Sequence, residues 1–240
     1  MTEEFNEEYE VVEGTVLSLK TFNGEINIEG GNSNKVVISA IKRTRFGENE
    51  FENVEIEVTQ EDGVLNIETK HLRDWVSRVS VDLSVKVPNN VIIDSVDTSN
   101  GDIDITGIKG DVEVRSSNGE INISDVDGFV KASTDNGRIY IEETKGISDL
   151  DSSNGDIIAN ISDFKDNSKV SSSNGEITLY LNPSLNAEIY MRTSNGKIST
   201  GDVLLTITEY DKSSIRGVIG IGGDQITVET SNGNINLYMQ

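Results

Sequence analysis

The stretch TSNGDIDI, residues 98–105, decides the fold, because close variants of it recur along most of the chain. It returns as SSNGEINI at residues 116–123 and as TDNGRIYI at residues 134–141, a step of 18 residues each time. Each copy contains Asn-Gly followed by any residue and then Ile. The eight copies begin at Thr21, Thr98, Ser116, Thr134, Ser152, Ser172, Thr193 and Thr230. A repeat of this kind predicts a stacked architecture in which each copy forms one structural unit.

The apolar residues within one period alternate with polar ones, which predicts short strands and very little helix. Ile103 and Ile105 follow the Asn-Gly, and Val112 and Val114 follow a second glycine at position 110. Asn-Gly is also the usual signal for a hairpin. The constant spacing of the repeats instead favours coils that stack about 4.8 Å apart. We therefore expect an all-β fold, a single-stranded parallel β-helix (β-solenoid) with about 18–21 residues per coil. The apolar spacing departs from a hexapeptide repeat, which favours a right-handed coil, and the number of sides stays open.

The repeat predicts one β-solenoid domain over residues 1–240 with three parts. Residues 1–95 form wider, irregular coils and a cap, residues 96–200 form the regular repeats, and residues 201–240 form the last coils and a second cap. The 37 residues between Gly196 and Gly233 predict two coils, of which the middle one lacks Asn-Gly. The ends need covers, because exposed strand edges favour end-to-end polymerisation.

Two polar ladders are expected at the Asn-Gly corner. A Ser or Thr precedes each Asn by two residues and should point into the core, where it needs a hydrogen-bond partner. The asparagine amides should stack from coil to coil, and we interpret both ladders as structural; the amide ladder comprises Asn100, Asn118, Asn136, Asn154, Asn174, Asn195 and Asn232. Asp94 occupies an inward register position, which predicts a bulge or a late strand start, with Asp94 capping a turn.

Composition excludes several classes of function. The 240 residues include 42 Asp plus Glu and 20 Lys plus Arg, a net charge of −22, so nucleic acid and anionic membranes are poor partners. There is no Cys and one His, which excludes thiol catalysis and any site with two imidazoles. We predict no cofactor, no metal and no catalytic residue. Without a signal-peptide pattern or a membrane-length apolar run, the chain as written is expected in the cytoplasm, or at the cell surface if it was trimmed.

A divergent β section that ends in VKVPNN, residues 85–90, precedes the regular repeats with their Gly-x-Val step. Together they resemble the putative-adhesin family of β-strand-repeat domains of unknown function from bacteria and archaea. The resemblance covers about residues 11–239. It implies a right-handed parallel β-helix without established catalytic residues, and its members are often attached to the cell envelope.

One region is locally basic and partly aromatic in this acidic chain, and we predict that it contacts a partner. Its residues are Arg43, Arg45, His71, Arg73, Trp75 and Arg78. The predicted function is a non-enzymatic, rigid scaffold for binding, adhesion or assembly. It would bind an unknown protein or glycan through a lateral sheet face or the protrusions at 41–53 and 70–78. The alternatives are a polysaccharide-active β-helix enzyme and a self-polymerising, cytoskeleton-like scaffold. We expect no membrane insertion and a monomer or a weak end-to-end oligomer.

Overall fold

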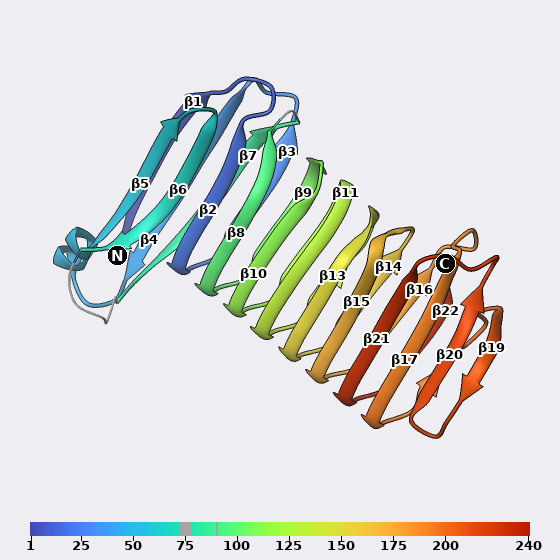
Figure 1. The fold of residues 1–240 in the computed structure, drawn as a ribbon. Helices are drawn as coiled ribbons and strands as arrows, with labels where there is room; N and C mark the ends of the chain where they lie inside the picture. Colours follow the sequence, from blue (N-terminus) through green and yellow to red (C-terminus); the bar gives the residue numbers. More distant parts are fainter. Residues whose placement is uncertain (73–77, 90) are drawn as a thin grey trace.

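The computed structural model describes residues 1–72, 78–89 and 91–240 and consists almost entirely of strands (Figure 1). One short 3₁₀ helix, η1 (Glu48–Asn53), interrupts them. The strands are β1 (Thr2–Glu10), β2 (Val16–Asn23), β3 (Ile26–Gly31), β4 (Lys35–Thr44), β5 (Val54–Glu61), β6 (Val64–His71), β7 (Val79–Pro88), β8 (Ile92–Asn100), β9 (Ile103–Lys109), β10 (Val112–Asn118), β11 (Ile121–Asn136), β12 (Ile139–Ile141), β13 (Thr144–Asn154), β14 (Ile157–Ile161), β15 (Phe164–Asn174), β16 (Ile177–Leu181), β17 (Ala187–Asn195), β18 (Ile198–Ser199), β19 (Leu205–Tyr210), β20 (Ser214–Ile219), β21 (Gln225–Asn232) and β22 (Ile235–Met239).

The strands form two long faces of parallel strands that enclose the core. The front face contains β2, β8, β10, residues 130–136 of β11, β13, β15, β21 and β17. The back face contains β3, β9, the start of β11, β12, β14, β16, β22 and β18. Ile121 pairs with Ile103 on one side and with Ile139 on the other, so equivalent residues lie in one column. The predicted parallel β-solenoid is confirmed.

The Asn-Gly corners are tightly packed because each glycine lies against the corner of the neighbouring coil. A Cβ atom on Gly155 would lie 1.8 Å from the carbonyl oxygen of Gly137, so no larger residue fits there without movement. The hydroxyls that precede the corners are buried, as expected. Ser152 Oγ, for example, donates to Gly137 O at 3.1 Å, and Ser172 Oγ donates to Gly155 O at 3.0 Å. These bonds satisfy polar groups that burial would otherwise penalise.

The coils at the N-terminal end do not stack in chain order. The coil β2–β3 lies between β6–β7 on its outer side and β8–β9 on its inner side. Two antiparallel pairs, β5 with β6 and β4 with β7, extend the faces outward, and β1 pairs with β4. The strand β1 was not expected, because its run of Glu has low strand propensity. Its pairing with β4 is antiparallel along its whole length, from Thr2 to Glu10.

The C-terminal end corrects the expected coil order. The last coil, β21–β22, lies between β15–β16 and β17–β18, although β17–β18 comes earlier in the chain. The segment expected to form an intervening coil is an antiparallel hairpin, β19–β20, that pairs with β17. A coil with an Asn-Gly corner can occupy any position in the stack. The repeat therefore predicts the coils but not their order.

Asp94 lies at the predicted irregularity. The pairing of β2 with β8 shifts register between Leu17 and Ser18, which face Ile93 and Ser95, so Asp94 is the extra residue. Its side chain is exposed. A bulge of this kind removes a carboxylate from the core without breaking the sheet.

Candidate functional site: a basic pocket in the N-terminal cap

A hollow of about 560 Å³ opens where β4 ends and β7 begins. The antiparallel pairing of these strands sets Arg43 opposite Ser80 and Thr44 opposite Val79. Arg45 continues from the end of β4, and Arg78 comes directly before β7. All three arginines line the hollow, although Arg78 is more than 30 residues away from the other two in the chain. We call this hollow the basic pocket.

The arginines of the basic pocket differ in how far they are already paired. Arg43 Nε lies 2.6 Å from Asp82 Oδ2, and its side chain is half exposed. The Arg78 guanidinium carbon lies 4.5 Å from the centre of the Phe46 ring, within cation–π distance. Phe46 is nonetheless 64% exposed. Arg45 is exposed and makes no ion pair with any residue in the described ranges. Two guanidinium groups therefore have hydrogen-bond donors available beside an open aromatic surface.

The electrostatics of the basic pocket oppose those of the whole molecule. Arginine stays protonated at any physiological pH. Asp82 neutralises one guanidinium and also accepts a hydrogen bond from Glu25 N at 3.3 Å. The pocket therefore keeps a local positive charge in a chain with a net charge of −22. Such a site favours an anionic group through charge-assisted hydrogen bonds.

The predicted contact residues are only partly brought together. Arg43, Arg45 and Arg78 line the basic pocket, whereas His71 does not. The His71 ring packs on Phe22 with 4.7 Å between the ring centres and a tilt of 37°. Arg73 and Trp75 lie outside the described residues. Phe46 was missed, although it stands between Arg45 and Gly47 in the run RTRFG, and that proximity to two arginines was a usable signal.

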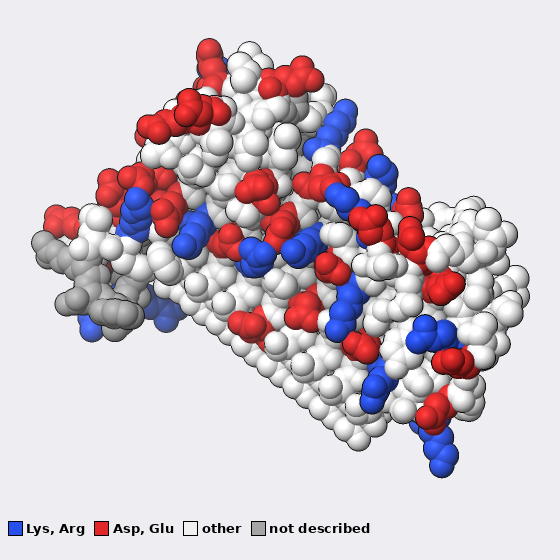
Figure 2. All heavy atoms as spheres, in the orientation of Figure 1, with Lys and Arg blue, Asp and Glu red and all other residues white. Residues whose placement is uncertain are grey.

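The front face carries acids and bases that alternate along the stacking direction (Figure 2). In one row Lys20 lies opposite Glu68 and Asp97, and Asp97 lies opposite Arg115. A second row reads Glu113, Lys131, Asp149 and Lys169. Opposite charges on neighbouring strands contribute roughly 0.2–1 kcal/mol per pair. The alternation therefore sets opposite charges side by side on neighbouring strands of the front face.

A polar hollow of about 510 Å³ on this face contains Asp97, Asp135 and Asp151 with Lys20 and Arg115. Partial burial raises the pKa of Asp97 despite the nearby charges of Arg115 and Lys20. The hydroxyl of Thr98, beside it in the chain, is buried and has no hydrogen-bond partner among the described residues. Arg115 and Ser133 lie between Asp97 and Asp151 in the row across the sheet.

The asparagine ladder is continuous and includes one residue more than expected, Asn23. Each side-chain amide donates a hydrogen bond to the side-chain oxygen of its neighbour, so the asparagines satisfy one another. The ladder follows the Asn-Gly corner, where Figure 2 shows an uncharged lower edge. The pairs are Asn100 to Asn23 (2.8 Å), Asn118 to Asn100 (2.9 Å), Asn136 to Asn118 (2.9 Å), Asn154 to Asn136 (3.0 Å), Asn174 to Asn154 (2.9 Å), Asn232 to Asn174 (2.8 Å) and Asn195 to Asn232 (2.9 Å).

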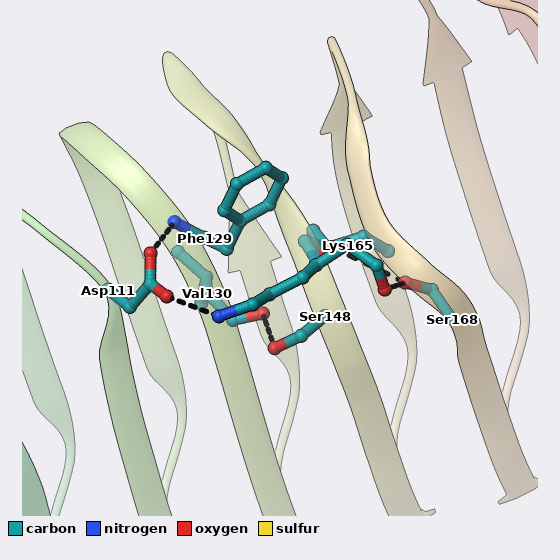
Figure 3. A network of polar contacts seen from close by, with 7 residues as sticks. Asp111, Phe129, Val130, Ser148, Lys165 and Ser168 are labelled. Carbon is teal, nitrogen blue, oxygen red and sulfur yellow. Dashed lines mark hydrogen bonds and ion pairs between the residues drawn. The ribbon is translucent and has the colours of Figure 1, made fainter.

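A further polar network joins Asp111, directly before β10, to the middle of β11 and the start of β15 (Figure 3). Lys165 Nζ lies 2.8 Å from Asp111 Oδ2, and Asp111 Oδ1 accepts a hydrogen bond from Phe129 N at 2.9 Å. Ser148 Oγ donates to Val130 O at 3.3 Å. Partial burial would raise the pKa of Asp111, but the bonds from Lys165 and Phe129 outweigh it and lower that pKa. We interpret the network as a clamp between coils.

The residues described show no cluster of three or more His, Cys, Asp or Glu side chains placed to hold a metal ion. Within the same residues, no helix has the length and apolar character that a membrane crossing requires. The basic pocket combines exposed arginines, an exposed aromatic ring and a hollow of about 560 Å³.

The sequence matches a known family over nearly the whole chain. The model of the Toastrack DUF4097 family matches residues 8–238. The chain belongs to this family. No curated protein matches this Toastrack chain.

Three solved structures are similar to this chain over nearly its whole length. A "putative adhesin" from Bacteroides fragilis is 14% identical and has a TM-score of 0.56. The alignment covers 99% of this chain and 97% of that one. A "putative cell adhesion protein" from Clostridium sporogenes is 18% identical, with full coverage of both chains and a TM-score of 0.40. A "putative lipid binding protein" from Parabacteroides distasonis is 17% identical, covers 98% and 96%, and has a TM-score of 0.44. At 14% identity, the similarity to the Bacteroides fragilis structure concerns the fold alone.

Proposed function

We propose that this Toastrack domain is a non-enzymatic, rigid scaffold that binds a partner through an anionic group in the basic pocket. The observation that carries the proposal is the convergence of Arg43, Arg45 and Arg78 beside the exposed Phe46. A volume of about 560 Å³ is typical of small-ligand sites. The adhesin name of the similar Bacteroides fragilis structure is consistent with a binding role.

The net charge restricts the type of anion. A chain with a charge of −22 repels a polyanion at long range, although salt screens this repulsion beyond about 8 Å at physiological ionic strength. A ligand with one phosphate, sulfate or carboxylate group avoids most of that repulsion and can still contact two guanidinium groups. An uncharged sugar or apolar ring next to the anion would pack on Phe46. The proposed ligand is thus an isolated acidic group on a protein or glycan partner.

Isothermal titration calorimetry with inorganic phosphate and with galacturonate tests this proposal, with galactose as the uncharged probe. We expect both anions to bind, galactose not to bind, and the double variant Arg45→Gln/Arg78→Gln to weaken anion binding on the order of tenfold or more, because it removes two charge-assisted contacts. Arg138→Gln, an exposed arginine on the back face, is the matched control and should bind like the wild type. Equal binding by all three proteins, or none by the wild type, would overturn the proposal.

A polysaccharide-active enzyme is the second candidate, because a carboxyl group with a raised pKa lies in the polar hollow of the front face. A general acid needs such a pKa, and Asp97 has it through burial. Incubating the domain with a panel of plant and microbial polysaccharides, followed by reducing-sugar analysis, tests this function. Product that forms with the wild type and not with Asp97→Asn would replace the scaffold proposal by catalysis.

A further inference from the structure

The C-terminal end of the front face finishes in a strand with a free edge. In the described part of the chain, β19 pairs with β20 and with no other strand. All but one of the six residues of β19 are exposed. Ile207 is 51% exposed and Tyr210 is 75% exposed, and Leu204, directly before the strand, is 86% exposed. Unpaired backbone groups next to exposed apolar side chains form a template for another strand.

The outer edges at the N-terminal end are protected in a way that β19 is not. The edge strand β1 contains Glu3, Glu4, Glu7, Glu8 and Glu10, and the edge strand β5 contains three more glutamates. Charged residues of one sign prevent two copies of such an edge from pairing. In β19 the single acid is Glu209, and Arg216 Nε on the neighbouring strand lies 3.4 Å from its carboxylate.

We propose that β19 pairs with β19 of a second copy of the chain, antiparallel and about a two-fold axis, to form a dimer joined at its C-terminal ends. The inference is independent of the function proposed for the basic pocket. A two-fold pairing centred on Ile207 sets each Leu204 opposite Tyr210 of the other copy and the two Ile207 residues opposite each other. Each exposed apolar residue of one edge then has an apolar residue of the other edge as its cross-strand neighbour.

The charges flanking the strand favour the same register. Asp202 lies in the turn before β19 and Lys212 in the turn after it, and the antiparallel two-fold pairing brings each of these turns near the other turn of the second copy. Both side chains are exposed in the single chain. Asp202 Oδ1 accepts a hydrogen bond from Met239 N at 3.0 Å, which holds its carboxylate in place. The strand is thus complementary to itself in charge as well as in apolar surface.

The distribution of charge along the chain also favours contact at this end. Residues 201–240 contain five acids and two bases, a net charge of −3 out of −22. Residues 1–100 contain twenty acids and nine bases, a net charge of −11. A C-terminal contact therefore places the strongly acidic N-terminal caps at the two far ends of the dimer, where their mutual repulsion is smallest. Contact between β19 and the acidic edge of β1 would not separate the two N-terminal caps in this way.

A bulge at Thr208 partly protects this edge. The pairing with β20 shifts register between Ile207 and Glu209, and the Thr208 hydroxyl donates to Arg216 O at 3.2 Å. A bulge increases the local twist of a strand. The residues on both sides of it, 205–207 and 209–210, remain in strand conformation, so both halves of the edge stay available to a second copy.

Sedimentation velocity of the full chain between about 1 and 100 µM tests the dimer. We expect the wild type to dimerise with rising concentration and Ile207→Lys to stay monomeric, because it places two like charges opposite each other at the two-fold axis. Val12→Lys, an exposed apolar residue outside this edge, is the matched control and should dimerise like the wild type. A wild type that is monomeric at 100 µM, or an Ile207→Lys variant that dimerises equally, would overturn the proposal.

Two further variants test the register itself. Lys212→Asp should weaken the dimer and Asp202→Lys/Lys212→Asp should restore it, because the swap recreates the opposite-charge pair. Since the chain has no Cys, Ile207→Cys supplies a single thiol that should form a disulfide-linked dimer under mild oxidation, whereas Val12→Cys should not. A charge swap that fails to restore dimerisation, or equal crosslinking of both Cys variants, would contradict pairing centred on Ile207.

Discussion

The N-terminal and C-terminal ends of the solenoid share one chain path but protect their edges differently. At each end, the coil nearest the chain terminus in sequence is not the outermost coil of the stack. It lies between two coils from elsewhere in the sequence. Antiparallel strands then continue the face outward. At the N-terminal end these strands are rich in Glu, whereas at the C-terminal end β19 presents Leu204, Ile207 and Tyr210. The comparison shows that capping a core and blocking a strand edge are separate tasks.

A second difference concerns what each cap can bind. The antiparallel pairing of β4 and β7 brings arginines distant in the chain to one hollow, which suits a small anion. The hairpin β19–β20 presents a backbone edge, which suits another strand. One end is therefore proposed to hold a ligand and the other to hold a second copy of the domain.

The largest expected effect comes from deleting the inserted coil at one end. Removing residues 225–240 takes away Ile226, Val228, Ile235 and Leu237, which are fully buried. At roughly 1.5–3 kcal/mol each, their loss amounts to about 6–12 kcal/mol, comparable with the whole stability of a typical domain. We expect the truncated chain to lose its cooperative urea transition, followed by circular dichroism.

Deletion of residues 1–10 is the matched test at the other end. The strand β1 contributes only the partly buried Phe5 and Tyr9 to the core, so we expect a cooperative transition with a free energy of unfolding lower by about 1–3 kcal/mol. Similar effects of the two deletions would contradict the inferred difference between an inserted coil and an added edge strand.

Substituting glycines at the corners should destabilise both ends to a similar, intermediate degree. A Cβ on Gly196 would lie 1.8 Å from Gly233 O, and one on Gly24 would lie 2.1 Å from Val81 O. Both alanine variants must separate neighbouring coils, which typically costs about 1–3 kcal/mol. Gly24 also has a φ of +129°, which adds strain for alanine. Urea denaturation of Gly196→Ala and Gly24→Ala measures the effect.

Gly31→Ala is the control for these variants, because nothing lies within 4 Å of the added Cβ. We expect its stability to equal or slightly exceed that of the wild type, as alanine restricts the unfolded chain. If Gly196→Ala were as stable as Gly31→Ala, the close stacking at the C-terminal corner would be wrong.

The smallest effect concerns alkaline pH, which should weaken the N-terminal edge. Burial raises the pKa of Tyr9 to about 12, helped by its hydrogen bond to Glu7 and the charge of that carboxylate. The hydrogen bond with Glu8 on β1 raises the pKa of Lys35. Because both folded pKa values exceed the unfolded ones, their stabilisation is complete below about pH 10 and is lost as the pH rises toward 12.

Ultraviolet titration of the phenol groups checks this prediction. The difference between the wild type and Tyr9→Phe should show one tyrosine with a midpoint near pH 12. A midpoint near 10, the ordinary value for tyrosine, would mean that β1 does not hold Tyr9 beside Glu7 in solution.

The repeated phrase predicted the strands, the buried hydroxyls and the amide ladder well, because each depends on a fixed register from coil to coil. The bulge at Asp94 was also predictable, since a charged carboxylate cannot stay in the core unpaired. The strand β1 was not, because its pairing depends on the backbone of β4 and its side chains are nearly all exposed. The local basicity of Arg43, Arg45 and Arg78 was visible in the sequence, but not their convergence on Phe46.

The sequence alone determined that the chain forms a parallel solenoid, because an apolar pattern repeated every 18 residues can bury its core only by stacking. The tertiary structure decided which coil lies next to which, because identical phrases have nearly identical stacking energies and only the connections at the ends distinguish their positions. It also decided the character of the two caps, because the basic pocket and the free edge of β19 depend on contacts between segments that the repeat does not relate.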